Sequence, residues 1–144
     1  MFDFVKDVKI TRVSAGATAA FTDVESDRVD MTGFDSVLFV CALGAVTSGG
    51  VVQLVAKSNA ADSASNSTTE KSGTSITTSS GDYDNKLLIV DLHRPTLRYA
   101  YVTVVRDTQN AAINYILAIQ YNAKNVPITQ GSTVGDLVFA GPLA

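Results

Sequence analysis

Residues 110–121, NAAINYILAIQY, decide the fold, because apolar side chains alternate along them with smaller or polar ones. One set of alternate positions holds Ile113, Tyr115, Leu117, Ile119 and Tyr121, and the other holds Ala112, Asn114, Ile116, Ala118 and Gln120. A period of two with many β-branched and aromatic residues is typical of a β-strand. Residues 98–105, RYAYVTVV, alternate in the same way, and the polar connection between the two segments predicts a β-hairpin over residues 97–121.

Other segments of similar character predict further strands. They are SVLFVCAL (36–43), GVVQLVAKS (50–58) and KLLIVDL (86–92), with weaker candidates at 5–13, 27–31 and 136–139. Gly49 and Gly50 lie between the first two segments and permit a tight return of the chain. No window of eleven or more residues has a period of 3.6, so no helix is expected. The pattern predicts an all-β protein, an antiparallel β-sandwich (Ig-like or jelly-roll-like) of about seven or eight short strands.

The length of 144 residues is that of a single domain. We assign residues 1–124 to one β-sandwich domain, which includes a Ser/Thr-rich excursion at residues 62–81 with 12 Ser or Thr in 20 positions. The excursion is expected to carry one exposed strand around TSITT (74–78) and to meet partners, as long surface loops often do. Residues 125–144 form a charge-poor C-terminal arm, in which Asp136 is the single charged residue.

The charge pattern argues against nucleic acid and membranes as partners. The net charge is −3, and the basic residues stand singly, so no basic stripe could neutralise a row of phosphates. No apolar run approaches the roughly 18 residues of a membrane span. Asp and Lys interrupt the first nine residues, which therefore lack the apolar stretch of a signal peptide. We expect a soluble protein that is synthesised in the cytoplasm.

The sequence contains no motif for catalysis. G-x-S-x-G and S-x-x-K are absent, and His93 is the only histidine. His93 precedes Arg94 and Pro95, and proline cannot continue a central strand, so a corner between strands is favoured over a general base. Cys41 is the only cysteine and lies in an apolar run, which predicts a buried thiol and excludes an internal disulfide. The protein is expected to be no enzyme and to hold no cofactor.

Two groups of residues could form a ligand site, and both have a plainer explanation. The acidic residues at 23–30 and 82–85 could offer oxygen ligands to calcium, but neither group matches an EF-hand loop. We favour solvated turns there and expect no metal. Tyr99, Tyr101, Tyr115 and Tyr121 could form a platform on one sheet face for stacking sugars or bases. Packing of these rings across paired strands explains them without a ligand, and we favour that interpretation.

Both ends of the chain carry apolar residues that are candidates for contact with a partner. These candidates are Phe2, Phe4, Val126, Ile128, Leu137 and Phe139. Exposed contiguous apolar surface usually marks an interaction site. The arm either adds an edge strand to its own sheet or crosses to a neighbouring subunit and adds one there.

Three stretches carry a resemblance to a known family: SAGATAAFTDVESDRVDMTGFDSVLFVCALGAVTSGGVVQLVAKSNAAD (14–62), GDYDNKLLIVDLHRP (81–95) and RYAYVTVVRDTQNAAINYILAIQY (98–121). Over about residues 13–124 the chain resembles small structural proteins encoded among the head genes of tailed bacteriophages. The resemblance implies a virion component, first of all a decoration (cement) protein that binds the major capsid protein on the outer capsid surface as a homotrimer. A head-to-tail connector or tail component is its alternative. The tyrosines leave open a receptor- or carbohydrate-binding module of a fibre.

Overall fold

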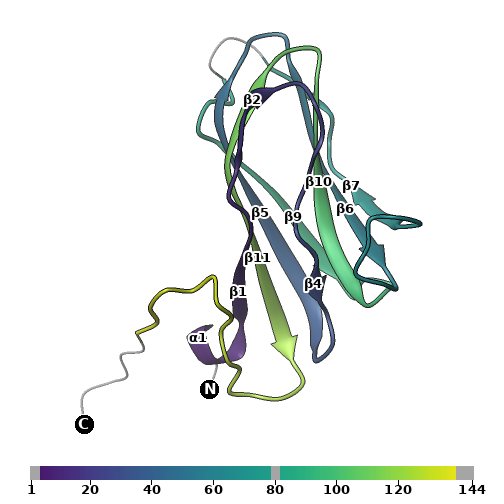
Figure 1. Cartoon of the computed structure of the whole chain (residues 1–144), viewed down its shortest axis with the longest axis vertical. Coiled ribbons are helices and arrows are strands. Elements are labelled where there is room, and N and C mark those ends of the chain that lie inside the picture. Colours follow the sequence, from purple (N-terminus) through teal and green to yellow (C-terminus); the bar gives the residue numbers. More distant parts are fainter. Residues whose placement is uncertain (1–3, 79–81, 139–144) are drawn as a thin grey trace.

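The computed structural model describes residues 4–78 and 82–138, which form two antiparallel sheets packed face to face (Figure 1). Sheet A contains β1 (Lys9–Ser14), β2 (Ala17–Ala20), β5 (Phe34–Val46), β9 (Leu87–His93) and β11 (Ala111–Ala123), in the order β1-β11-β5-β9, with β2 also paired to β11. Sheet B contains β3 (Val24–Glu25), β4 (Val29–Asp30), β6 (Val51–Asn59), β7 (Thr68–Ser72), β8 (Ile76–Thr77) and β10 (Tyr99–Asp107), in the order β3-β10-β6-β7, with β4 paired to β10 and β8 to β6. The prediction of an antiparallel all-β sandwich is confirmed.

The described residues form eleven strands, more than the sequence predicts. The strands that the sequence does not predict are β2, β3 and β7, which have two to five residues and show no apolar alternation. The short strands β4 and β8 lie within the segments predicted at 27–31 and 74–78. The Ser/Thr-rich excursion carries two strands, β7 and β8, instead of one. The predicted strand at 136–139 does not form at residues 136–138, and Phe139 lies outside the described residues.

One short helix, α1 (Phe4–Asp7), precedes β1, although no helix was expected. The segment predicted as a strand from residue 5 therefore becomes a strand only at Lys9. A single turn of this length has no periodicity that a sequence window can detect, and tertiary contacts hold it. No helix in the described residues is long and apolar enough to span a membrane.

The predicted hairpin over residues 97–121 is wrong, because its two strands belong to different sheets. Val102 of β10 pairs with Ala56 in sheet B, whereas Leu117 of β11 pairs with Val40 in sheet A. The Gly49 turn (φ +83°) likewise joins β5 of sheet A to β6 of sheet B instead of returning within one sheet. A short polar connection looks the same in sequence whether the next strand pairs with the last one or crosses to the opposite sheet.

The core lies between the two sheets and is built from alternate residues of the long strands. Sheet A contributes Val37, Phe39, Cys41, Leu43, Leu88, Val90, Leu92, Ile113, Ile116 and Ala118, and sheet B contributes Val52, Leu54, Ala56, Ala100, Val102 and Val104. All of these side chains are buried, so the alternation that identifies the strands also places one face of each in the core.

The orientation of β11 is the least expected feature of the sandwich. The register against β5 shifts between Ala111 and Ile113 and again between Ile113 and Tyr115. After these shifts Ile116, Ala118 and Gln120 are buried, and the larger apolar residues of the strand face outward. Gln120 is only 2% exposed, and its side-chain amide donates a hydrogen bond to the main-chain oxygen of Asp30 at 2.8 Å. That partner allows a polar residue to occupy a core position.

Candidate interaction surface

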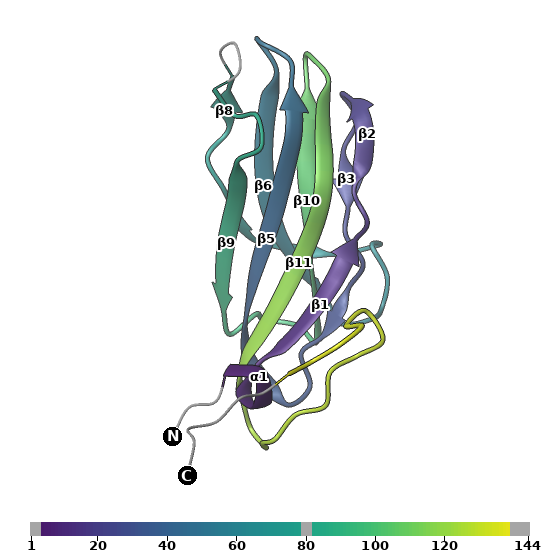
Figure 2. The same ribbon diagram turned by 90° about the vertical axis from the view of Figure 1, so that its left-hand side faces the viewer.

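Sheet A lies toward the viewer in Figure 2, with β9, β5, β11 and β1 side by side. Its outer face is apolar across β5, β9 and β11. In β9, Leu88, Val90 and Leu92 are buried, so the intervening residues point away from the core; Leu87 is 51% exposed and Ile89 57%. Ile89 pairs with Val40 of β5, and Val40 pairs with Leu117 of β11. We call this surface the A face and define it as Leu38, Val40, Leu87, Ile89, Tyr115, Leu117 and Ile119. Contiguous apolar surface of this kind marks an interaction site.

The opposite side of the sandwich has a different character. In β6, Val52, Leu54 and Ala56 point into the core, so Gln53 and Lys57 lie on the outer face of sheet B. The edge strand β7 adds exposed threonines and Lys71. The two outer faces therefore differ in polarity, and the A face is the one that gains by being covered.

A hollow of about 350 Å³ lies where the A face meets α1. Phe4, Val8, Leu38, Asp91, Ile119 and Tyr121 line it. The Tyr121 hydroxyl donates a hydrogen bond to Oδ1 of Asp91. Burial, helped by this hydrogen bond, raises the pKa of Tyr121 above its ordinary value, so the hydroxyl stays a donor. The hollow thus offers apolar walls with one polar pair, which suits an inserted apolar side chain of a partner.

The structure places part of the predicted contact set beside this hollow. Phe4 on α1 lines it and is 51% exposed. Ile128 is half-buried, and its main-chain N–H donates to the Lys6 oxygen of α1 at 2.9 Å, so the arm and the N-terminal helix lie together. Val126 and Leu137 are exposed on the arm. Phe2 and Phe139 lie outside the described residues.

His93 lies at the corner that the sequence predicts. It is the last residue of β9, its ring is exposed, and Nδ1 lies 2.6 Å from the Ser36 hydroxyl. Arg94 follows with a φ of +52° and turns the chain. Arg94 and Arg98 project at this end of the sandwich and pair with Asp35 (3.4 Å) and Asp30 (2.8 Å), respectively.

The tyrosine platform is not assembled. Tyr99 and Tyr101 lie in sheet B, and Tyr115 and Tyr121 lie in sheet A, so the four rings share no face. Tyr101 is fully buried, with the guanidinium of Arg28 5.7 Å from its ring centre. The four rings therefore cannot stack a common ligand, and the favoured interpretation, packing of the rings across one pair of strands, is wrong as well because β10 and β11 do not pair.

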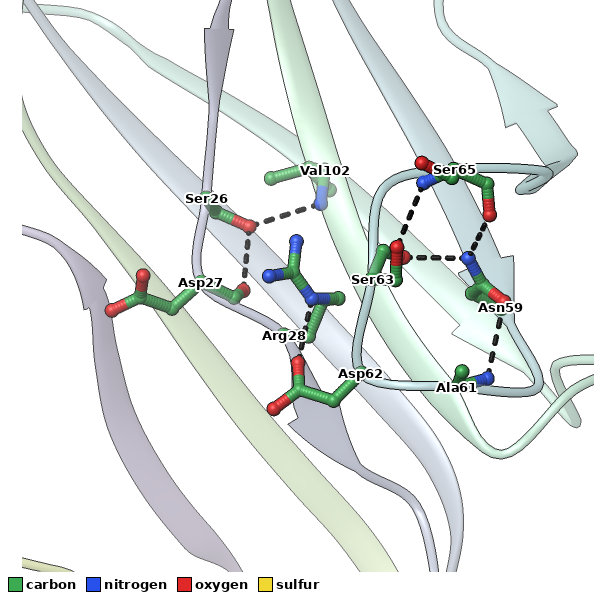
Figure 3. A network of polar contacts seen from close by, with 9 residues as sticks. All are labelled: Ser26, Asp27, Arg28, Asn59, Ala61, Asp62, Ser63, Ser65 and Val102. Carbon is green, nitrogen blue, oxygen red and sulfur yellow. Dashed lines mark hydrogen bonds and ion pairs between the residues drawn. The ribbon is translucent and has the colours of Figure 1, made fainter.

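The acidic stretch at 23–30 is part of the edge of sheet B, as Figure 3 shows. Ser26 lies in the chain between β3 and β4, which both pair with β10. Its hydroxyl accepts the Val102 N–H at 3.0 Å and donates to the Asp27 oxygen at 2.9 Å. Arg28 reaches across to Asp62 at 2.6 Å. In the described parts of the chain no three His, Cys, Asp or Glu side chains form a group that could hold a metal ion.

Comparison with models of known protein families finds no matching family, and comparison with curated protein sequences finds no significant match. The surfaces described above are therefore the basis for inferring a function. The A face is the feature that the sequence analysis missed. Two runs carry a signal for it, SVLFVCAL (36–43) and KLLIVDL (86–92), because apolar residues occupy both sets of alternate positions in each. A strand with one face in water needs apolar residues in one set alone.

Proposed function

We propose that the protein is a structural virion component without catalytic activity, a decoration (cement) protein of a tailed-bacteriophage head. In this proposal it self-associates as a homotrimer, binds the major capsid protein on the outer capsid surface, and stabilises the shell by bridging neighbouring capsid subunits. The family resemblance of residues 13–124 supports the phage assignment. The apolar A face is the single observation that carries a role in assembly, because a sandwich that works alone has no use for it.

The A face also sets the scale of the expected contact. Full burial of a Leu or Ile side chain contributes about 1.5–3 kcal/mol. Leu87 and Ile89 are each about half exposed, so covering both contributes about 2 kcal/mol, or roughly 30-fold in affinity. The half-buried residues of the A face and Phe4 add to this. Asp91, which lines the hollow, supplies a carboxylate that could accept a hydrogen bond from the partner and so orient it.

Binding to capsids tests the proposal. Expanded capsids purified without this protein are mixed with the wild type, with Ile89→Asp and with Thr69→Asp, and co-sedimentation is measured. Both substitutions place a carboxylate at an exposed position of an edge strand, Ile89 in sheet A and Thr69 in sheet B. We expect Ile89→Asp to lose at least tenfold in affinity and Thr69→Asp to bind as the wild type does.

Two results would count against this function. Absence of saturable binding by the wild type would end the cement assignment. Equal loss from both substitutions would show that the A face is not the contact. The position of the protein in a virion density map separates the remaining alternative, since a connector or tail component would lie at the neck or along the tail.

A further inference from the structure

The free edge of β1 is covered by side chains instead of a strand. β1 pairs with β11 along one edge only. On its other edge the Ile10 N–H donates to Oε1 of Gln130 at 2.9 Å, and the Arg12 N–H donates to Oγ1 of Thr133 at 3.1 Å. Nε2 of Gln130 in turn donates to the Val8 oxygen at 2.7 Å. Two side chains of the arm thus occupy places that the main chain of a neighbouring strand would take.

Gln130 adds a further contact between the arm and the N-terminal segment, since its Nε2 also donates to the Val5 oxygen at 3.3 Å. Among the described residues no main-chain hydrogen bond joins the arm to β1, and the Ile128 N–H reaches only α1. The connection from the end of β11 to this first contact, residues 124–127, is exposed, and its first residue is held to the body of the domain, because the Lys124 N–H donates to the Gly33 oxygen at 2.8 Å. Beyond Thr133, Leu137 and Val138 are exposed as well. The arm is therefore a segment with a solvent-exposed hinge and a small, self-contained binding site on β1.

We propose that in the oligomer the arms are exchanged, so that Gln130 and Thr133 of one copy bind the β1 edge of the next copy. The inference rests on the self-association included in the proposed function and is independent of capsid binding. Each copy then offers one arm and accepts one, and in a trimer the three exchanges close a ring. Of the two alternatives that the sequence left open, the arm adds no edge strand to its own sheet within the described residues. The exchange corresponds to the other alternative, a crossing to a neighbouring subunit, with side chains in place of an added strand.

The length of the hinge defines how the copies must meet. The five Cα steps from Ala123 to Ile128 span at most about 18 Å when extended. An exchanged arm must therefore come from a copy whose β11 ends within that distance of the acceptor's α1. The copies are brought together at their α1 ends, where Phe4 is exposed.

The energetics explain why exchange needs this second contact. The arm makes the same hydrogen bonds on its own body or on a neighbour, and a short hinge gives the internal site an effective concentration in the millimolar range. Exchange is favoured only when it brings new surface together. Phe4, Leu137 and Val138 provide apolar surface for that purpose, on the helix and on the arm itself.

Cross-linking of paired cysteines tests the exchange in the full-length protein. A Cβ placed on Gly131 would lie 3.7 Å from Cε of Lys9, so Lys9→Cys with Gly131→Cys brings two thiols within reach of a short bismaleimide without touching Gln130 or Thr133. Cys41 does not interfere, since burial raises the pKa of its thiol to about 12. The matched control is Lys57→Cys with Gly131→Cys, which moves one thiol to the outer face of sheet B.

Denaturing gels and light scattering give the outcomes. We expect covalent dimers and trimers, and nothing larger, from the Lys9/Gly131 pair and only monomers from the control pair. Internally linked monomers from a protein that light scattering shows to be oligomeric would overturn the exchange and leave self-association standing. A monomer at every concentration tested would overturn both, while capsid co-sedimentation would still report on capsid binding.

Discussion

Replacing Arg106 by Met should destabilise the protein more than any other single change of an arginine in it. Arg106 is 3% exposed, and its guanidinium donates to the main-chain oxygens of Thr22 (2.7 Å), Thr18 (2.9 Å) and Ala111 (2.6 Å). These acceptors lie on β2, on the connection that follows it, and at the start of β11. A single side chain at the end of β10 thus forms hydrogen bonds with three separate segments at one end of the sandwich.

The size of the effect follows from what each acceptor can do after the substitution. A hydrogen bond from a charged donor contributes about 1.5–3 kcal/mol, and a buried group left without a partner costs about 1–3 kcal/mol. Thr18 and Thr22 are exposed, so water can replace the lost donor, whereas Ala111 is buried. Burial also lowers the pKa of Arg106, which shows that the charged form bears a desolvation cost that Met removes. We therefore expect a loss of about 3 kcal/mol, well below the sum of three bonds.

Urea unfolding followed by circular dichroism measures this loss. We expect an unchanged slope, a lower midpoint, and a melting temperature lower by roughly 6–12 °C for Arg106→Met. Arg12→Met is the control, because Arg12 is an exposed arginine on β1, and it should change the free energy of unfolding by less than about 0.5 kcal/mol. Arg106→Lys should recover less than half of the loss, since an ammonium cannot reach all three oxygens in one plane. A loss below about 1 kcal/mol for Arg106→Met would refute this reasoning.

Three further predictions concern other parts of the sandwich. Val104→Asp buries a carboxylate at a fully buried core position and should leave no folded protein at 25 °C by circular dichroism, whereas Val104→Ala should fold with a loss of a few kcal/mol. His93→Ala removes an exposed ring and should lower the free energy of unfolding by less than about 1 kcal/mol in urea and leave capsid binding unchanged. Burial alone would raise the pKa of Glu70, but hydrogen bonds from Ser58 and Thr96 outweigh it and hold that pKa below its ordinary value. The folded state then binds fewer protons than the unfolded chain, so this stabilisation is complete above about pH 4.3 and is lost as the pH falls. When the free energy of unfolding is measured against pH, Glu70→Gln should show a smaller decrease than the wild type on the acid side. An unchanged decrease would contradict the assignment.

The sequence was sufficient for the class of fold and for the long strands. Alternation over residues 86–92, 98–105 and 110–121 identifies β9, β10 and β11, because burial of one face of a strand imposes a period of two. It could not assign strands to sheets. β10 and β11 are joined by only three residues, yet the chain crosses between the sheets there, and Thr47 N–H bonds to the Asn110 oxygen at 2.9 Å to join the two crossing connections. Such pairing depends on contacts far apart in sequence.

The A face could not be predicted from the sequence for a related reason. In β11 the set of alternate positions with the larger apolar side chains looks like the core face, but Leu117 and Ile119 point outward. Two register shifts around Ile113 reverse the orientation, and a bulge of this kind leaves no mark in an alternating pattern. The buried amide of Gln120 shows the same limit, since its acceptor on Asp30 is 90 residues away. The buried Arg106 was likewise not anticipated.

The two sheets limit pairing with other chains by different means, and for this reason we place the proposed partner contacts on sheet A. Sheet B ends at β7, whose exposed threonines and Lys71 discourage pairing with another chain, and its other side ends in the two short strands β3 and β4. Sheet A has neither device: its A face is apolar, and its β1 edge is covered by Gln130 and Thr133 of the arm and, at Val13, by the Asp27 N–H, which donates to the Val13 oxygen at 2.7 Å. If contacts in the assembly fall on sheet A, charge substitutions there should impair assembly while leaving monomer stability nearly unchanged, and those on the outer face of sheet B should be neutral for both. If charge substitutions on the two sheets impaired assembly equally, the difference in polarity between the sheets would have another cause.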